Sequence, residues 1–548
     1  MRKLFRDTVT VCVTLLPLLA CSTETPADQA SSKRGGTIVI SASADADILL
    51  PQLTMSVQGK QIGDQIFDNL ADIGDSLNTV GDAGFRPRLA RAWKWAVDSS
   101  SIDFMIDPAA RWHDGQAVRS SDVKYTFDLV RNPAFGSQLA PTLEDVDSVT
   151  TPDSLTARVW VSHHPPSLFF RLAGGIAILP EHLLAKIAPK DIRASAFARA
   201  PVGSGRFRFS KWTPSQTITL VEDSANYRGR PATDRIVWLV SPDYDAAALR
   251  FLAGQSDFLD LVKPDFLERV KTSGKSIVTG IPSLSYGYVA FNFHDGKRSR
   301  PHPIFADRDV RRALVMSVDR RALVKNVFDT LGLVGRGPFT RALATSDTAS
   351  GLPYDTVAAG RILDAAGWKK SASGTRTKAG VPLHFTLLVP GSSAIRMKFA
   401  VLLQEQWKRV GADVAIEPLE LSTFGERLET HNFDALLNAW QIDPDPASVR
   451  DEWMSADRRK DGFNFASYSN RQFDAIVDSA AMNENPVRSA QQYRAAYRIL
   501  TDDAPALWLY ESKNVFGVSK RIEPTGMRPD AWWARLPDWR VVSGPQTP

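Results

Sequence analysis

Hydrophobic and polar positions alternate between strand-like and helix-like periods, most clearly between residues 383 and 416. Residues 383–389 form a short apolar run, which predicts a buried strand. Residues 393–409 carry apolar side chains at helical spacing, and Gly411 ends this predicted helix before a second strand at 412–416. This order is a βαβ unit, so we expect its two strands to be parallel.

A third apolar run, 433–440, ends abruptly in Asp443-Pro444-Asp445-Pro446. Proline lacks the backbone N–H that a strand ladder needs, so this turn directs the chain out of the sheet. The parallel rhythm places the carboxyl ends of the strands at one edge, where open α/β sheets bind ligands. Taken alone, the turn is more typical of a solvated surface loop.

Similar patterns predict elements along the rest of the chain. Alternation predicts a hairpin from residues near 93–95 and 101–106, and another strand pair within 145–161. Apolar runs at 288–293, 507–510 and 514–519 predict further strands. Helices are expected at 56–70, 121–131, 244–253, 308–317, 320–329 and 355–366, with Ser120 or Ser121, Asp307 and Asp319 as N-caps. Mixed elements of this kind predict an α/β fold.

The length of the chain indicates more than one domain. At 548 residues it exceeds what a single hydrophobic core supports, which favours two or three domains. A hydrophobic content of 43% and a charged content of 23% are typical of a globular protein. The 14 Trp residues are numerous enough to supply ligand-facing walls as well as core.

The first 20 residues have the features of an export signal. Arg2, Lys3 and Arg6 precede an apolar run at 9–20 that is too short to span a membrane. The sequence Leu18-Leu19-Ala20-Cys21 resembles a bacterial lipoprotein cleavage site, with Cys21 as the lipidated residue. Residues 21–35 are rich in Ser, Thr, Asp and Gly, which predicts a flexible tether.

Removing residues 1–20 limits the chemistry that remains. Cys12 would be lost and Cys21 would carry lipid, which excludes thiol catalysis and Cys-ligated metal in the body. Losing three basic residues and one acidic residue changes the formal net charge from +5 to +3. No Lys/Arg block remains, so we expect no nucleic acid partner.

Three motifs that suggest chemistry have simpler structural interpretations. The adjacent His113 and Asp114 point apart on extended chain, so we expect a turn rather than a catalytic pair. His163 and His164 lack the spacing of metal ligands. The Gly-rich stretch at 201–207 leads into a strand rather than a helix, which argues against a phosphate loop.

Several short motifs occur in an order typical of one family. They include Arg88-Leu89-Ala90 with Trp93, Trp112-His113-Asp114-Gly115, Asp309-Val310-Arg311-Arg312-Ala313-Leu314, Ala365-Ala366-Gly367-Trp368, Phe433-Asp434 with Trp440, and Tyr468-Ser469-Asn470 with Phe473-Asp474. Together they resemble bacterial extracellular solute-binding protein family 5, the dipeptide/oligopeptide-binding class of ABC-transporter binding proteins. The chain departs from the family at Phe67-Asp68, where Tyr-Glu is usual, and in the 201–207 turn. With these departures, the resemblance does not identify the ligand.

The resemblance implies a two-lobed periplasmic-binding-protein fold of the three-domain oligopeptide-binding type. Its ligand cleft would lie between the lobes, with crossing strands near 288–292 and 507–510 as the hinge. Carried over, the first domain comprises 36–65, 202–288 and 502–542, the second comprises 66–201, and the third comprises 289–501.

The resemblance also implies a site and a role. An acid three residues after the family Trp pairs with the α-ammonium group of a peptide, and this position is Asp443. We expect Trp440 as a wall of the site, with Asn438 of the same run as a further ligand-binding residue. No Arg or Lys matches a family motif for the ligand carboxylate. No catalytic residue, metal or cofactor is expected.

The expected function is a lipid-anchored, monomeric solute-binding protein in the periplasm or cell envelope. It would capture short peptides for an ABC permease/ATPase complex and contact the membrane through its lipid alone. The same family allows another solute, namely an oligosaccharide, an opine, or a nickel or haem chelate. A secreted hydrolase is a distant alternative, because the sequence has no Gly-x-Ser-x-Gly or His-Glu-x-x-His motif.

Overall fold

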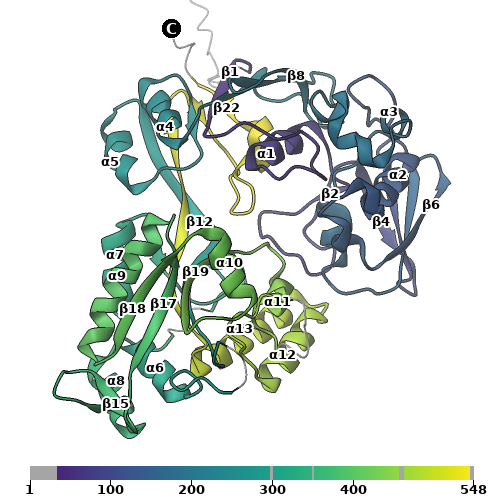
Figure 1. Ribbon diagram of the computed structural model, residues 1–548. Coiled ribbons are helices and arrows are strands. Elements are labelled where there is room, and N and C mark those ends of the chain that lie inside the picture. Colours follow the sequence, from purple (N-terminus) through teal and green to yellow (C-terminus); the bar gives the residue numbers. More distant parts are fainter. Residues whose placement is uncertain (1–33, 297–299, 348–350, 456–461, 543–548) are drawn as a thin grey trace, which may run out of the picture. The chain divides into compact units, whose positions relative to one another are not determined.

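The computed structural model describes residues 34–296, 300–347, 351–455 and 462–542 (Figure 1). Three predicted features lie outside the described residues: the signal peptide at 1–20, the lipidation site Cys21 and the part of the tether up to residue 33. Among the helices described, none has the length and apolar character needed to cross a membrane.

A mixed sheet of 11 strands organises the described chain. Its order is β18 (Asp413–Leu419), β17 (His384–Pro390), β19 (Ala435–Gln441), β12 (Ser276–Phe291), β20 (Ala506–Ser519), β11 (Phe258–Leu259), β1 (Thr37–Ala42), β10 (Arg235–Val240), β9 (Thr217–Glu222) and β8 (Phe207–Thr213). Strand β13 (Gly332–Val334) pairs with β20 beside this path.

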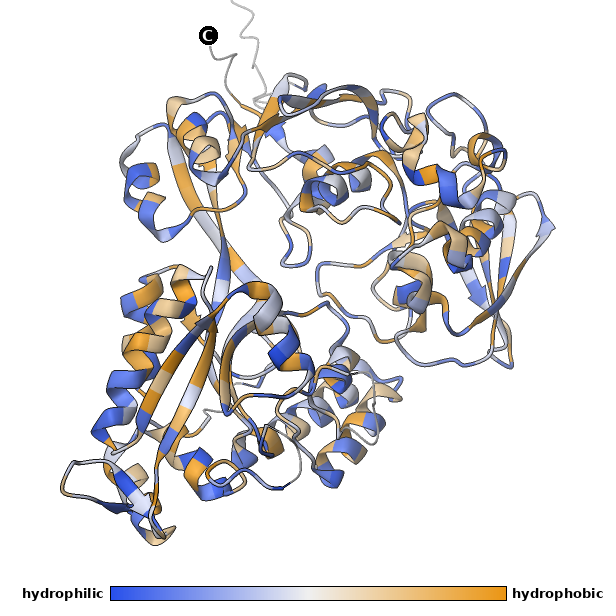
Figure 2. Cartoon of the chain, viewed as in Figure 1, coloured by the Kyte–Doolittle hydropathy of each residue, from blue (hydrophilic) through white to orange (hydrophobic). Residues whose placement is uncertain are grey.

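The predicted βαβ unit is confirmed. Strands β17 and β18 are parallel, and α9 (Ala394–Arg409) joins them. Strand β19 is also parallel to β17, so all three carboxyl ends lie at one edge of the sheet. Figure 2 shows that these strands are mainly hydrophobic, whereas the helices beside them have hydrophobic and hydrophilic sides. This is the pattern of a sheet covered by amphipathic helices.

Two long antiparallel strands, β12 and β20, join the two halves of the sheet. Their pairing runs from Ser276↔Ser519 to Ala290↔Ala506, with register shifts on either side of Tyr286 and Gly287. The prediction of separate strands at 507–510 and 514–519 is wrong, because β20 continues through the polar residues between them. Strand β13 pairs with two of these residues, Glu511 and Ser512, which keeps their backbone in the sheet.

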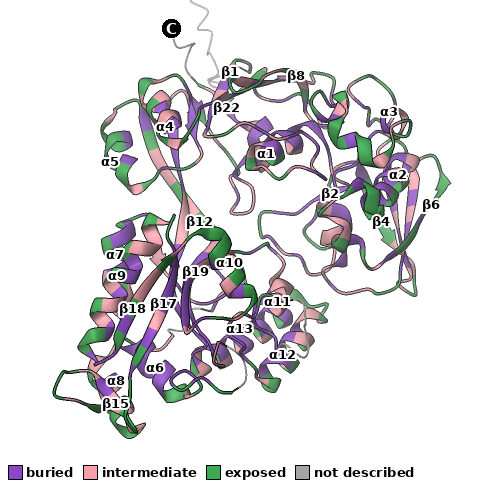
Figure 3. Ribbon diagram, viewed as in Figure 1, coloured by how far each residue is buried: buried purple, intermediate pink, exposed green. Residues whose placement is uncertain are grey.

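Strand β12 contributes to two hydrophobic cores. Tyr286, Tyr288 and Ala290 belong to one buried cluster, and Val289 and Phe291 belong to the other. Alternate residues of a strand point to opposite faces, so this part of β12 is buried on both sides. Figure 3 shows the corresponding run of buried residues along the strands around β12.

A second, antiparallel sheet has the order β4 (Ala90–Trp95), β5 (Ser101–Ile106), β7 (Thr156–Val161) and β6 (Val146–Asp153). Both predicted strand pairs are confirmed. Helix α2 (Ser120–Arg131) packs against β6 and β7. Its predicted Ser cap is wrong, since the N-cap is Arg119 and the Ser120 hydroxyl donates to the Asp153 carbonyl instead.

Helix α1 (Val57–Ile66) ends four residues before its predicted end. The reason is competition for backbone groups. The Ile66 carbonyl accepts a hydrogen bond from Gly205 N at 2.8 Å, and the Leu70 carbonyl accepts one from Ala90 N at 3.0 Å. A Cβ on Gly203 would lie 1.9 Å from the Ile66 carbonyl oxygen. The Gly-rich turn therefore permits close backbone packing, as its structural interpretation requires.

Four of the remaining helices lie where the sequence predicts them: α4 (Tyr244–Ala253), α6 (Arg308–Met316), α7 (Arg320–Phe328) and α8 (Thr356–Ala365). The others are α3 (Glu181–Leu184), α5 (Pro264–Thr272), α10 (Leu421–Glu429), α11 (Val449–Trp453), α12 (Arg471–Ala481) and α13 (Pro486–Asp503). The predicted N-caps are confirmed, since the Asp307 and Asp319 side chains accept from Asp309 N and Ala322 N. The remaining strands are short: β2 (Ala71–Asp72), β3 (Arg86–Pro87), β14 (Lys369–Lys370), β15 (Arg376–Lys378), β16 (Val381–Pro382), β21 (Ile522–Glu523) and β22 (Arg540–Val541).

Candidate functional site

The turn after β19 leaves the sheet as its prolines predict. The last backbone bond of the strand runs from Ile442 N to the Leu284 carbonyl of β12, at 2.9 Å. Asp443 Oδ1 then accepts from Asp445 N at 2.8 Å. The Asp445 side chain accepts from Ala447 N at 3.0 Å and caps the 3-10 turn Pro446–Ser448. Asp445 therefore stabilises the turn locally.

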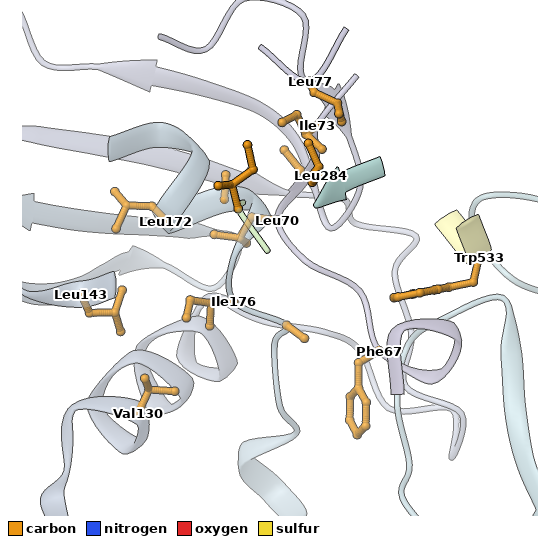
Figure 4. Packing of buried hydrophobic residues seen from close by; sticks show 14 of the residues in the cluster. Phe67, Leu70, Ile73, Leu77, Val130, Leu143, Leu172, Ile176, Leu284 and Trp533 are labelled. Carbon is orange, nitrogen blue, oxygen red and sulfur yellow. The ribbon is translucent and has the colours of Figure 1, made fainter. Parts of the chain in front are cut away.

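Asp443 lines a cavity of about 570 Å³. Residues 441–444 and Leu284 form one part of the wall, and the other parts include residues 51–55, Phe67, Ile73 and Trp533. Figure 4 shows Leu284 close to Ile73 and Leu77, and all three belong to one buried cluster. A volume of this size lies within the range of about 300–1,000 Å³ that is usual for ligand pockets.

The Asp443 carboxylate has no cationic partner within 4.0 Å among the described residues. Burial raises its pKa to about 7, and the neighbouring Asp445 carboxylate adds to the rise. The residue as a whole keeps an exposed surface, whereas protein atoms surround most of its carboxyl group. An unpaired carboxylate with a raised pKa is a favourable position for a cationic ligand group.

Trp440 and Asn438 lie on one face of β19, opposite Tyr286 and Tyr288 of β12. The Trp440 ring is half-buried, with its centroid 5.0 Å from that of Phe463. Neither residue is part of the described lining of the cavity that Asp443 enters. Of the three predicted ligand-binding residues, the structure brings only Asp443 to this cavity, and the roles of the other two stay predictions.

The sequence did not reveal Glu452, a buried acid close to the site. Its residue is 5% exposed, and the Tyr286 hydroxyl donates a hydrogen bond to Oε2. Burial raises the pKa of Glu452 to about 8, with the charges of Asp451 and Asp443 adding to it. A signal was present, because Val449, Glu452 and Trp453 share the buried face of α11 at helical spacing.

The adjacent His113 and Asp114 form no catalytic pair. Gly203 N donates to His113 Nδ1 at 3.2 Å, so the ring accepts at Nδ1 and its Nε2–H donates to the Gly205 carbonyl at 2.8 Å. Asp114 instead pairs with His182 at 2.7 Å. No cluster of potential metal ligands occurs within the described ranges.

Asp68, one of the departures from the family pattern, has a structural role. Its residue is fully buried, and its carboxylate accepts from the Tyr227 hydroxyl at 2.9 Å and from the Arg228 guanidinium. A buried carboxylate needs such partners, so this substitution is stabilised by contacts that lie 159 and 160 residues away in the sequence.

A family model described as bacterial extracellular solute-binding proteins, family 5 Middle, matches residues 84–461. The chain belongs to this family. The family 5 protein is 24% identical to the oligopeptide-binding protein AppA of Bacillus subtilis (strain 168), across 94% of this chain and 96% of AppA. It is also 24% identical to the probable D,D-dipeptide-binding periplasmic protein DdpA of Escherichia coli (strain K12), across 89% and 90% of the two chains.

Solved structures share the fold of this chain. AppA from Bacillus subtilis in complex with a nonapeptide matches with a TM-score of 0.71 at 23% identity, covering 93% of this chain and 99% of AppA. NikZ from Campylobacter jejuni in complex with Ni(L-His) matches with a TM-score of 0.72 at 21% identity, covering 92% and 99%. The predicted α/β, two-lobed periplasmic-binding-protein fold is therefore confirmed.

Proposed function

We propose that this family 5 protein is the lipid-anchored receptor of an ABC importer that binds short peptides and delivers them to a permease. The names of its relatives AppA and DdpA support a peptide as the solute. The family is one of transporter binding proteins, which supports a role in binding rather than catalysis.

The observation that carries the proposal is the Asp443 carboxylate in the wall of the cavity, with no cationic partner among the described residues. The α-ammonium group of a peptide is a small cation with three N–H donors, which suits such an acceptor. A charge-assisted hydrogen bond of this kind contributes about 1.5–3 kcal/mol net. In the absence of peptide, the raised pKa lets the Asp443 carboxyl group bind a proton near neutral pH, so the empty site need not hold a lone charge.

The role of Asp443 is tested with Asp443→Asn and two forms of each peptide, one with a free amino terminus and one N-acetylated. We expect the wild-type protein to prefer the free form by about tenfold or more, and Asp443→Asn to lose that preference. Isothermal titration calorimetry measures both affinities. Equal weakening of the two forms would refute an ammonium contact at Asp443.

Asp64→Asn is a matched control, because Asp64 lines the same cavity and is already paired. Its carboxylate lies 3.0 Å from Lys60 Nζ and accepts from Trp533 Nε1 at 2.8 Å. Removing this charge changes the field of the cavity without removing an unpaired acceptor. We expect the preference for a free amino terminus to survive in this variant.

The solved structure of NikZ with Ni(L-His) favours one alternative, a metal chelate. The cavity weighs against it, since its described lining contains no His or Cys. A sugar would instead stack on an aromatic ring such as Trp440. Native mass spectrometry of the purified protein separates these cargoes by mass, and the mass of the denatured chain tests whether Cys21 carries lipid.

A further inference from the structure

Several ends of strands in the large sheet lie at one edge and carry basic residues. Strands β1 and β10 are parallel and begin there together, as the first pair of their register shows. Strand β11 is parallel to β1 and antiparallel to β20, so β20 ends at this edge and its partner β12 begins there. Four exposed basic residues flank these strand ends, and we call them the anchor edge: Arg34, Arg235, Lys275 and Lys520.

Hydrogen bonds from two consecutive residues hold parts of the anchor edge together. Lys520 N donates to the Lys275 carbonyl at 3.0 Å. The next residue, Arg521, donates from its guanidinium to the Thr37 carbonyl at 2.6 Å, at the first residue of β1. The four basic residues are therefore grouped around the start of β1.

The acidic side chains near this edge have basic partners of their own. These ion pairs are Arg521–Asp257, Arg206–Asp538, Arg208–Asp223, Arg230–Glu222 and Arg230–Asp234. Glu523 and Arg540 lie opposite each other on β21 and β22, so their charges offset each other. Within the described part of the chain, none of the four anchor-edge residues has a carboxylate oxygen within 4.0 Å. Their positive charges are therefore not neutralised by the protein.

The predicted tether joins the described chain at this same edge. Arg34 is the first described residue, and residues 22–33 separate it from Cys21. Even fully extended, a chain of this length spans at most about 45 Å. A lipid on Cys21 would therefore keep the anchor edge close to the bilayer that holds the lipid.

We propose that the anchor edge binds the anionic phospholipid head groups of the membrane into which the lipid of Cys21 inserts. The inference rests on the lipid anchor of the proposed function, and it adds a protein surface to a contact that the sequence predicts through lipid alone. An anionic membrane surface attracts basic residues within about one Debye length, about 8 Å at physiological salt. A lipid and a basic surface reinforce each other as membrane-binding signals. The lobe that carries β1 would then rest on the bilayer.

The test uses the lipidated protein in vesicles of phosphatidylcholine alone or of phosphatidylcholine and phosphatidylglycerol in equal parts. A donor fluorophore on Ser224→Cys reports the approach of this edge to acceptor-labelled lipid head groups by energy transfer. Ser224 is exposed in the turn between β9 and β10, and the mature chain has no other free thiol when Cys21 is lipidated. We expect the ratio of docked to undocked protein to be about tenfold or more higher on the anionic vesicles. At about 1 M salt, where the Debye length is about 3 Å, this difference should disappear.

A fourfold variant removes the anchor edge, and a second fourfold variant controls for net charge. The first combines Arg34→Gln, Arg235→Gln, Lys275→Gln and Lys520→Gln. Because each basic residue near an anionic surface changes the ratio by about fivefold, we expect this variant to dock equally on both kinds of vesicle. The control replaces exposed residues of α7 and α9, beside the other half of the sheet: Lys325→Gln, Lys398→Gln, Lys408→Gln and Arg409→Gln. We expect the control to keep the wild-type difference.

The outcomes separate this inference from the proposed function. If the mass of the denatured protein shows no lipid on Cys21, the proposed anchor and this inference fail together. If the protein is lipidated but energy transfer is equal on both kinds of vesicle, or the anchor-edge variant keeps the difference, the docking is overturned and the anchor and peptide binding are unaffected. Loss of the difference in the control as well would show an effect of net charge and would overturn the role of the anchor edge.

Discussion

If Asp443 binds the ammonium group of a peptide as proposed, we expect its raised pKa to make peptide binding sensitive to acid. The perturbation is a change of pH from 7 to 5 on the folded, ligand-free protein, a range in which the α-amino group of a peptide stays protonated. The Asp443 carboxyl has a pKa of about 7, above the value of about 3.9 in an unfolded chain. An ammonium ligand binds the charged form, so affinity falls as the pH drops from 7 to 5, below the folded pKa.

The magnitude follows from the charged fraction of Asp443. With a pKa of about 7, half of the molecules are charged at pH 7 and about 1% at pH 5. The apparent dissociation constant scales inversely with the competent fraction, which gives about a 50-fold loss between these pH values.

The assay is calorimetric titration of one free-amino-terminus peptide across this pH range, in two buffers with different ionisation enthalpies. We expect binding near pH 6 to release a proton, since the ligand ionises a protonated Asp443. Asp443→Asn should bind weakly at every pH and release no proton. A wild-type affinity that is constant from pH 7 to pH 5, or proton release that persists in Asp443→Asn, would refute the reasoning.

Two further predictions concern stability. In Gly287→Ala the new Cβ would lie 2.1 Å from Tyr510 Cε1 on the paired strand β20. We expect the free energy of unfolding to fall by about 1–3 kcal/mol, which lowers the midpoint of urea unfolding. An unchanged midpoint would show that Tyr510 can move aside. The pKa of buried Glu452, raised to about 8 from about 4.3, destabilises the wild-type fold as pH rises between these values. We therefore expect Glu452→Gln to be more stable than wild type by a few kcal/mol above pH 8 and to differ little from it near pH 4, as measured by thermal unfolding. A gain in stability that is independent of pH would show that the charge of Glu452 is not its cause.

Local patterns predicted much of the fold. The spacing of the apolar residues and the position of Gly411 were sufficient to predict the βαβ unit of β17, α9 and β18, because these three consecutive elements pack against one another. The N-caps Asp307 and Asp319 were equally readable, since a cap acts within three residues.

The errors arose where distant segments decide the conformation. Residues 511–513 read as a polar break, yet β20 continues through them because β12 and β13 pair with it. The Arg341 guanidinium lies 3.1 Å from the buried Glu511 carboxylate and offsets its charge. In the same way, α1 stops at Ile66 because Gly205, 139 residues later in the chain, donates to the Ile66 carbonyl.

The candidate site also combines features that local patterns predict with features that only distant contacts determine. The position of Asp443 at the cavity was predictable because the residue follows a strand and a Trp at a fixed spacing, whereas its role in binding stays a prediction. The partners of Arg193, which lines the same cavity, were not predictable, since Leu53 and Asp47 lie about 140 residues earlier. Ion pairs of this kind are set by tertiary contacts, and no local pattern distinguishes a paired arginine from an available one.

The central claim is that the protein carries short peptides in the cavity beside Asp443. Native mass spectrometry of the protein, purified without denaturation from cells that export it, tests this most directly. We predict a series of bound masses that fragment as short peptides with free amino termini, and their loss in Asp443→Asn. A single bound sugar or metal chelate in the wild-type protein, retained unchanged in Asp443→Asn, would contradict the claim.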